Sequence, residues 1–202
     1  GAPRGVLLRA RSAPARAIGR NALHVLQDGG KGRGLAVYGN QACISYQDKN
    51  HITVVDIAGK KVLGNAPIEN PKGCAFDSQG NFFVLSSQYL LRGIPTSMGL
   101  TQAETLMTAL DEPHGLFITS DDQFYISEWG NTNNITHYNS SFEIQKTYGT
   151  AGPLSVGPYD STHMQRPAGI ALDYKGNLWV AELAYIPKRV SVWNTQDQSL
   201  IK

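Results

Sequence analysis

The stretch Arg166-Pro-Ala-Gly-Ile-Ala-Leu-Asp-Tyr-Lys-Gly-Asn-Leu-Trp-Val-Ala-Glu182 decides the fold, because two other segments of the chain align with it without gaps. They are Asn70-Pro-Lys-Gly-Cys-Ala-Phe-Asp-Ser-Gln-Gly-Asn-Phe-Phe-Val-Leu-Ser86 and Glu112-Pro-His-Gly-Leu-Phe-Ile-Thr-Ser-Asp-Asp-Gln-Phe-Tyr-Ile-Ser-Glu128. Each segment reads Pro, any residue, Gly, an apolar run, a polar turn and a second apolar run. A degenerate fourth copy begins at Gly34.

The copies recur at the pitch of a repeat protein. Their glycines, Gly34, Gly73, Gly115 and Gly169, are 39, 42 and 54 residues apart. Propeller blades recur about every 40–50 residues. Two short apolar runs joined by a polar turn predict a hairpin, and runs without alternation predict strands buried on both faces.

A third strand and an outer strand are also predicted in the units. Alternating segments follow at 52–55, 135–138 and 190–193, and more polar segments follow these at 61–63, 143–146 and 199–201. The segment 101–110 has helical apolar spacing, but it is short and has no clear cap, so we assign it to the outer part of its unit. Four strands per unit predict an all-β fold, a β-propeller of four-stranded antiparallel blades. The blades cover approximately residues 31–67, 68–110, 111–162 and 163–202, after an Arg-rich, partly extended arm at 1–30.

The last unit and its continuation Arg189-Val-Ser-Val-Trp193 resemble the NHL repeat. The glycine-punctuated link Tyr148-Gly-Thr-Ala-Gly-Pro-Leu-Ser-Val-Gly-Pro-Tyr159 is similar to the connection between NHL blades. The resemblance covers residues 32–202 and is most specific in the third and fourth units. Where the family usually has Asp after the second strand, this chain has Ser86, Glu128 and Glu182.

NHL propellers usually have six blades, whereas four are visible in this chain. The resemblance therefore implies either a four-bladed ring or four blades of a six-bladed ring. An open ring leaves unpaired strand edges, which invite pairing. We expect further blades, self-association or a closing strand to cover them, and the apolar segment 22–26 is a candidate for that strand.

Composition and charge exclude several classes of protein. The chain of 202 residues has 41% hydrophobic and 17% charged residues, and no apolar run approaches the ~18 residues of a membrane span. Residues 1–20 carry five Arg and no acid, so the rest holds 13 Lys and Arg against 16 acids. This weakly acidic body predicts no nucleic-acid surface. The low charge and two N-glycosylation sequons, which begin at Asn134 and Asn139, favour secretion. The Arg-rich arm resembles an organelle transit peptide, which suggests an organelle as the alternative location.

The resemblance also gives an expectation for His114, which lies between the Pro and the Gly that open a unit. Several NHL proteins direct this position toward the central channel, and peptidyl-hydroxyglycine lyases of this fold place zinc-binding histidines there. The equivalent positions hold Arg33, Lys72 and Ala168, whereas a catalytic zinc site needs about three protein ligands. We therefore expect a hydrogen-bonded histidine at the channel rim. No cofactor is predicted, and a Ca²⁺ or Zn²⁺ ion in the channel is the alternative.

Glu128 and Glu182 follow the second strands of their units. A pair of carboxylates suggests a general acid and base or a cation site. Because they recur with the repeat, the simpler interpretation is structural, with each carboxylate accepting backbone N–H groups of the following turn.

The cysteines and two sequons are further candidate sites. Cys43 and Cys74 lie in adjacent units, where a cross-blade disulfide is one alternative and free thiols in a packed core are the favoured one. Asn134 and Asn139 begin Asn-X-Ser/Thr sequons on either side of a predicted third strand. We expect both asparagines to be exposed, as candidate glycosylation sites.

The most promising surface is one rim of the propeller. Trp129 and Tyr185 follow second strands, and a rim that combines them with Lys72, His114 and Arg189 would form a binding face. We therefore predict a non-catalytic binding or scaffold module that recognises a protein, peptide or glycan partner through propeller loops. The alternatives are a channel-centred enzyme, either a metal-dependent lyase or a hydrolase, and a structural subunit of a large assembly.

Overall fold

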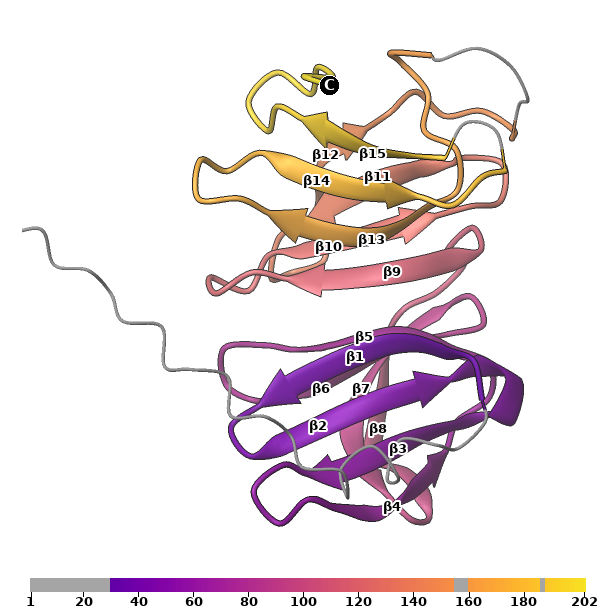
Figure 1. Cartoon of the computed structure of the whole chain (residues 1–202), viewed down its shortest axis with the longest axis vertical. Helices are drawn as coiled ribbons and strands as arrows, with labels where there is room; N and C mark the ends of the chain where they lie inside the picture. Colours follow the sequence, from indigo (N-terminus) through magenta and orange to yellow (C-terminus); the bar gives the residue numbers. More distant parts are fainter. Residues whose placement is uncertain (1–29, 155–159, 186–187) are drawn as a thin grey trace, which may run out of the picture.

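The computed structural model describes residues 30–154, 160–185 and 188–202, which form four antiparallel sheets (Figure 1). In each sheet the strands are paired in sequence order, so every sheet is a simple meander. Three sheets have four strands and the last has three. The prediction of an all-β propeller with four blades is confirmed.

The strands of the four blades follow the repeat. Blade 1 contains β1 (Gly32–Tyr38), β2 (Gln41–Tyr46), β3 (His51–Asp56) and β4 (Lys61–Pro67), with a 3-10 turn, η1, at Gln47–Lys49. Blade 2 contains β5 (Pro71–Phe76), β6 (Phe82–Ser86), β7 (Tyr89–Thr96) and β8 (Gly99–Met107). Blade 3 contains β9 (Pro113–Ile118), β10 (Phe124–Glu128), β11 (Asn134–Tyr138) and β12 (Ile144–Tyr148). Blade 4 contains β13 (Pro167–Leu172), β14 (Leu178–Glu182) and β15 (Arg189–Trp193).

Two outer segments show how local pattern and tertiary pairing compete. The segment with helical spacing forms most of β8, which pairs with β7, so sheet pairing overrides its helical periodicity. The outer strand predicted at 199–201 is reduced, in the described part of blade 4, to an isolated bridge between Trp193 and Leu200. The candidate closing strand at 22–26 lies outside the described residues.

In blades 2 and 4, the turn between the first two strands is built by an Asp–Asn pair. Asp77 accepts hydrogen bonds from the backbone N–H groups of Gln79 and Asn81, and Gly80 adopts a positive φ of 82°. Asp173 makes the same contacts in blade 4, where Gly176 has a φ of 81°. An Asx turn followed by a left-handed glycine closes the hairpin and fixes its register.

The hydrophobic core lies between consecutive blades rather than inside any one of them. Three clusters of buried side chains join blade 1 to blade 2, blade 2 to blade 3 and blade 3 to blade 4. Each blade therefore depends on its neighbour to bury its apolar faces, as expected for a repeat architecture.

Close approach of the inner strands explains the repeated glycine. A Cβ on Gly34 would lie 2.7 Å from the Lys72 carbonyl oxygen, and one on Gly73 would lie 2.8 Å from the carbonyl oxygen of His114. A Cβ on Gly115 would be closer still to the carbonyl oxygen of Ala168. At all three blade interfaces, the glycine of one blade thus packs on the residue before the next glycine.

Candidate functional site

The inner strands of all four blades meet around one cavity. It has a volume of about 380 Å³, within the usual range for a ligand site, and it is open to solvent. All four repeat glycines line it, together with Arg33, Leu35, Cys74, His114, Leu116, Ala168, Ile170 and Leu183. Of the four positions that precede the repeat glycines, Arg33, His114 and Ala168 line this cavity, whereas Lys72 is not among its lining residues.

Three nitrogen-bearing side chains from three blades are grouped at the cavity. Arg33, Lys72 and His114 each precede the repeat glycine, and Arg33 and His114 line the cavity directly. Burial, together with the charges of Arg33 and Lys72, lowers the pKa of His114 to about 4, so its imidazole is neutral at pH 7. Burial also lowers the pKa of Lys72, with Glu112 acting in the opposite direction and Arg33 in the same direction.

The expected hydrogen bond of His114 is absent at one ring nitrogen. His114 is 7% exposed, and its Nε2 atom is buried without a hydrogen-bond partner. The ring is held instead by stacking on Trp129, with ring centroids 4.0 Å apart and an interplanar angle of 11°. A neutral imidazole with an unused nitrogen beside two cations can donate to or accept from a bound molecule.

Trp129 is fixed by the next blade. Its indole N–H donates to the carbonyl oxygen of Pro167 at 2.6 Å, and the guanidinium carbon of Arg166 lies 5.4 Å from the centroid of its ring. Sequence reasoning missed Arg166. The residue before the repeat proline has a positive φ in blades 2, 3 and 4, but it is Asn70, Glu112 and Arg166 in turn, so no recurring residue type marks this contact in the sequence.

The rim beside this stack is partly apolar. Leu183 lines the cavity and is 47% exposed, and Tyr185 is 86% exposed. The segment after β14 is anchored by backbone hydrogen bonds from Leu183 to Arg166 and from Ala184 to Gln165. Trp129 and Lys72 are each linked to His114, the first by ring stacking and the second by the effect of its charge on the pKa of His114. Tyr185 follows the anchored segment and is exposed.

Glu128 and Glu182 have structural roles, and the predicted contact needs a correction. Glu128 accepts a hydrogen bond from the backbone N–H of Asp111, and Glu182 accepts one from Gln165, both 17 residues earlier in the chain. Each carboxylate therefore ties down the loop that precedes its blade, not the following turn. Ser86 occupies the same position in blade 2 and donates to the carbonyl oxygen of Glu69, again 17 residues earlier. Burial raises the pKa of Glu128 above its ordinary value.

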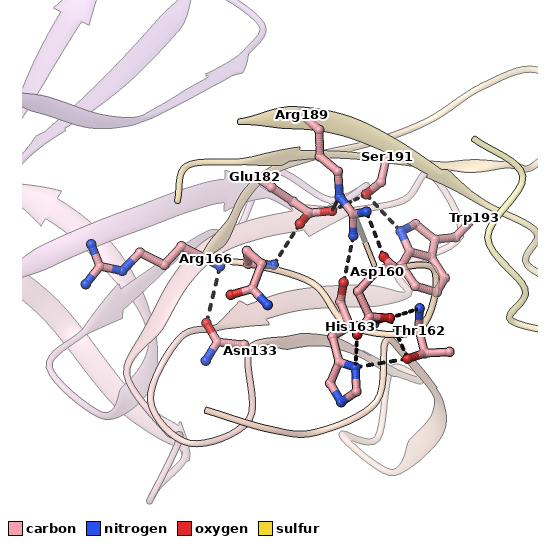
Figure 2. Close-up of polar contacts among 10 residues, drawn as sticks. Asn133, Asp160, Thr162, His163, Arg166, Glu182, Arg189, Ser191 and Trp193 are labelled. Carbon is pink, nitrogen blue, oxygen red and sulfur yellow. Dashed lines mark hydrogen bonds and ion pairs between the residues drawn. The ribbon is translucent and has the colours of Figure 1, made fainter. Parts of the chain in front are cut away.

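Arg189 contributes to a buried network instead of a binding face (Figure 2). Its Nε donates to Glu182 at 2.7 Å, and its terminal nitrogens donate to the carbonyl oxygens of Asp160 and His163. Ser191 donates to the same Glu182 oxygen. These contacts use the charge of Arg189 to hold the loop before β13 against β14 and β15. The expectation that Arg189 joins the rim candidates is not supported by this placement.

Two serines that the sequence reading did not single out bridge neighbouring blades. Ser45 donates to the carbonyl oxygen of Lys72 in blade 2. Ser127 accepts from the N–H of Gly115 at 2.8 Å and contacts the carbonyl oxygen of Ala168 in blade 4. Both serines occupy the penultimate position of a second strand, and this recurrence is the signal that would have identified them.

The remaining candidates lie away from the cavity mouth or are buried. Cys43 and Cys74 are free buried thiols, so the disulfide alternative is not formed. Asn134 is 5% exposed, which contradicts the expected exposure of this sequon. The Asn139 amide oxygen accepts from the backbone N–H groups of Ser141 and Glu143, so this side chain is engaged in its own turn.

Within the described ranges, no group of three or more His, Cys, Asp or Glu side chains is arranged to hold a metal ion. The same residues include no helix that is long and apolar enough to cross a membrane.

Comparison with known proteins gives structural neighbours only. No family model matches the chain, and no curated protein matches it by sequence. A gluconolactonase from Xanthomonas campestris has a TM-score of 0.63 at 12% identity, covering 84% of this chain and 60% of its own. A Bacteroides thetaiotaomicron protein of unknown function has a TM-score of 0.65 at 16% identity, with 85% and 47% coverage.

A catalytically inactive virginiamycin B lyase from Staphylococcus aureus, bound to quinupristin, is also similar. Its TM-score is 0.56 at 18% identity, covering 84% of this chain and 54% of the lyase. At such identities these likenesses establish the propeller fold alone. The chain spans between 47% and 60% of the length of these three structures.

Proposed function

We propose that this chain is a non-catalytic binding module whose central cavity recognises a carboxylate-bearing peptide. The proposal rests on one observation: Arg33, Lys72 and His114, from three blades, occupy the same repeat position and influence one another electrostatically. The arrangement has two cations and a neutral imidazole close enough to interact, and Arg33 and His114 line the cavity. Guanidinium and ammonium groups with a nearby neutral donor match the two oxygens of a carboxylate.

The Arg33 guanidinium is already oriented before a carboxylate binds. Its Nε donates to Gln47 at 2.9 Å, and Gln47 in turn donates to Asn70 at 2.7 Å, so the guanidinium is oriented by side chains of blades 1 and 2. A pre-oriented guanidinium loses less side-chain entropy on binding than a free one. His114 lines the same cavity as Arg33, and its ring is held in a fixed orientation by stacking on Trp129.

The buried side chains that could act as a general acid, a general base or a nucleophile make structural hydrogen bonds instead. The buried Glu128, Glu182 and Ser127 accept backbone hydrogen bonds, and Glu182 is also paired with Arg189. This use favours recognition over the alternative of a channel-centred enzyme. The Pro-x-Gly repeat with its glycine-punctuated link supports, in addition, the proposal that the blades are of the NHL type.

Calorimetric titration with a tetraglutamate peptide tests the proposal. We expect saturable binding that weakens with salt, and a dissociation constant about tenfold higher for Arg33→Gln, because a charged hydrogen bond contributes about 1.5–3 kcal/mol. Lys31→Gln is the matched control, since Lys31 is an exposed cation two residues away that does not line the cavity. Equal affinity of the Arg33→Gln variant and the wild-type chain, or no binding, would refute the proposal.

A further inference from the structure

Blade 1 exposes side chains that the other blades bury against the blade before them. In blades 2, 3 and 4, the first and third residues after the repeat glycine pack into the preceding interface: Cys74 and Phe76, Leu116 and Ile118, and Ile170 and Leu172. The same positions in blade 1 are Leu35 and Val37, which are 66% and 56% exposed. Blade 1 thus presents one half of a blade interface to solvent.

Blade 4 exposes the other half. Two aligned positions, one on the second strand and one on the third, face the next blade. They are occupied by Cys43 and Ile52 in blade 1, Phe83 and Leu90 in blade 2, and Tyr125 and Ile135 in blade 3, all of which are at most 5% exposed. In blade 4 these positions hold Trp179 and Val190, which are 37% and 58% exposed.

Gly169, the repeat glycine of blade 4, is an independent sign that this blade has an uncovered face. Gly34, Gly73 and Gly115 each pack tightly on a carbonyl group of the following blade. Among the described residues, by contrast, the only neighbour near a Cβ on Gly169 is the Ala181 side chain at 3.5 Å. Trp179 is nevertheless held in place, because its indole N–H donates to Asp173 at 3.0 Å. The Lys202 ammonium lies 5.3 Å from its ring and covers part of it.

We propose that these two faces bind each other in a pair of identical chains, with blade 4 of each copy docked on blade 1 of the other. Each chain carries both halves of a blade interface that it already forms three times internally. Blade 1 of a second copy is therefore complementary to the exposed face of blade 4. In the docked pair, Leu35 and Val37 of one copy pack on Trp179 and Val190 of the other. The Arg33 carbonyl group, which is equivalent to those of Lys72 and Ala168, packs on Gly169.

Two such contacts close a two-fold symmetric ring. A pair of four-bladed chains contains eight blades, which is within the range of four to eight that closed propellers hold. Closure also removes both exposed apolar faces, whereas a single contact would leave one pair open to further association. This inference does not depend on the proposed carboxylate site.

Sedimentation velocity over a range of concentrations tests the pairing. The wild-type chain is expected to sediment as a dimer of two 22.0 kDa chains. Leu35→Glu and Val190→Glu each place an unpaired charge in both contacts of the ring, so each variant alone is expected to be monomeric, with a dissociation constant raised at least about 100-fold. Ile144→Glu, on the outer strand of blade 3, is the matched control because Ile144 is as exposed as Leu35, at 66%.

Mixing the two variants distinguishes head-to-tail docking from other dimers. The unchanged blade 4 of Leu35→Glu fits the unchanged blade 1 of Val190→Glu, so the mixture is expected to recover a heterodimer through one contact. Circular dichroism confirms that each variant is folded, and Val37→Glu replaces Leu35→Glu if that variant is not. A wild-type chain that stays monomeric at every concentration would overturn the proposal and favour further blades on a longer polypeptide as the occupant. A dimer that survives either substitution would overturn it as well.

Discussion

Glu182 and Arg189 form a buried ion pair at the junction of β14, β15 and the loop that precedes β13. Their side chains are 0% and 9% exposed, and Arg189 Nε donates to Glu182 Oε1 at 2.7 Å. Both oxygens of Glu182 are occupied, because Ser191 also donates to Oε1 and the Gln165 N–H donates to Oε2. The charge pair therefore has the additional hydrogen bonds that a buried pair needs to offset its desolvation.

Removing one partner of this pair is expected to destabilise the protein strongly. Arg189→Met leaves the Glu182 carboxylate buried without its counter-charge, which typically costs about 3–5 kcal/mol. Urea unfolding at pH 7 measures the change. The control is Arg92→Met, since the Arg92–Glu104 pair has side chains that are 44% and 53% exposed and is expected to contribute at most about 1 kcal/mol. Equal losses for the two variants would contradict the structural role of Arg189.

His114 makes stability depend on pH in the acidic range. Its pKa is lowered from an ordinary value of 6.5 to about 4, so between these values the unfolded state binds more protons than the folded state. Stability is therefore expected to fall as the pH is lowered from 6.5 to about 4, by at most about 3 kcal/mol from this group. Urea unfolding at several pH values should show a shallower slope in this range for His114→Gln. An unchanged slope would show that His114 is not held neutral by its surroundings.

The two thiols are expected to be unreactive in the folded chain. Burial raises the pKa of Cys43 and of Cys74 to about 12, and their side chains are 0% and 4% exposed. An aromatic disulfide reagent at pH 8 should react with both thiols in urea and only slowly in buffer, because the thiolate is the reactive form. Failure of either thiol to react in urea would indicate that the cysteines form a disulfide.

Gly115 and Gly169 offer a direct comparison of an occupied and an open blade interface. Gly115→Ala places a methyl group against the Ala168 carbonyl group, so the backbone of blade 3 or blade 4 must shift. We expect a loss of at least about 2 kcal/mol in thermal unfolding, typical of overpacking. Gly169→Ala has room within one chain and is expected to change stability by less than about 0.5 kcal/mol under conditions where the chain is monomeric. A similar loss for both variants would contradict the difference between the two interfaces.

The fold was predictable because the strand signals are local. In blades 2, 3 and 4, the Pro-x-Gly opening, the polar turn and the two apolar runs lie within 17 residues, so each of these hairpins is specified without knowledge of the rest of the chain. Repetition then implied that each unit packs on the next. The segment that forms most of β8 was resolved in the same way, since its position in the repeat outweighed its helical spacing.

Side-chain partners across blades were less predictable. The Arg166–Trp129 contact joins blades 3 and 4, and Ser127 contacts Ala168 at a separation of 41 residues. Arg189 was expected near the rim that carries Trp129 and Tyr185, yet its long side chain reaches back to the loop at Asp160. Asn134 was expected to be exposed because it falls at the turn before a predicted third strand, but it is the first residue of β11, an interior strand, and is 5% exposed. Strand patterns fix which face a residue occupies, whereas these contacts depend on how blades and loops meet.

Amide chemical shifts measure whether the cavity lined by the four repeat glycines is the site where a carboxylate ligand binds. On titration with tetraglutamate, we expect the backbone amides of Gly34, Gly73, Gly115 and Gly169 to shift together, with one dissociation constant. Shifts confined to one or two of these glycines, or located only on outer strands such as β8 and β12, would contradict it.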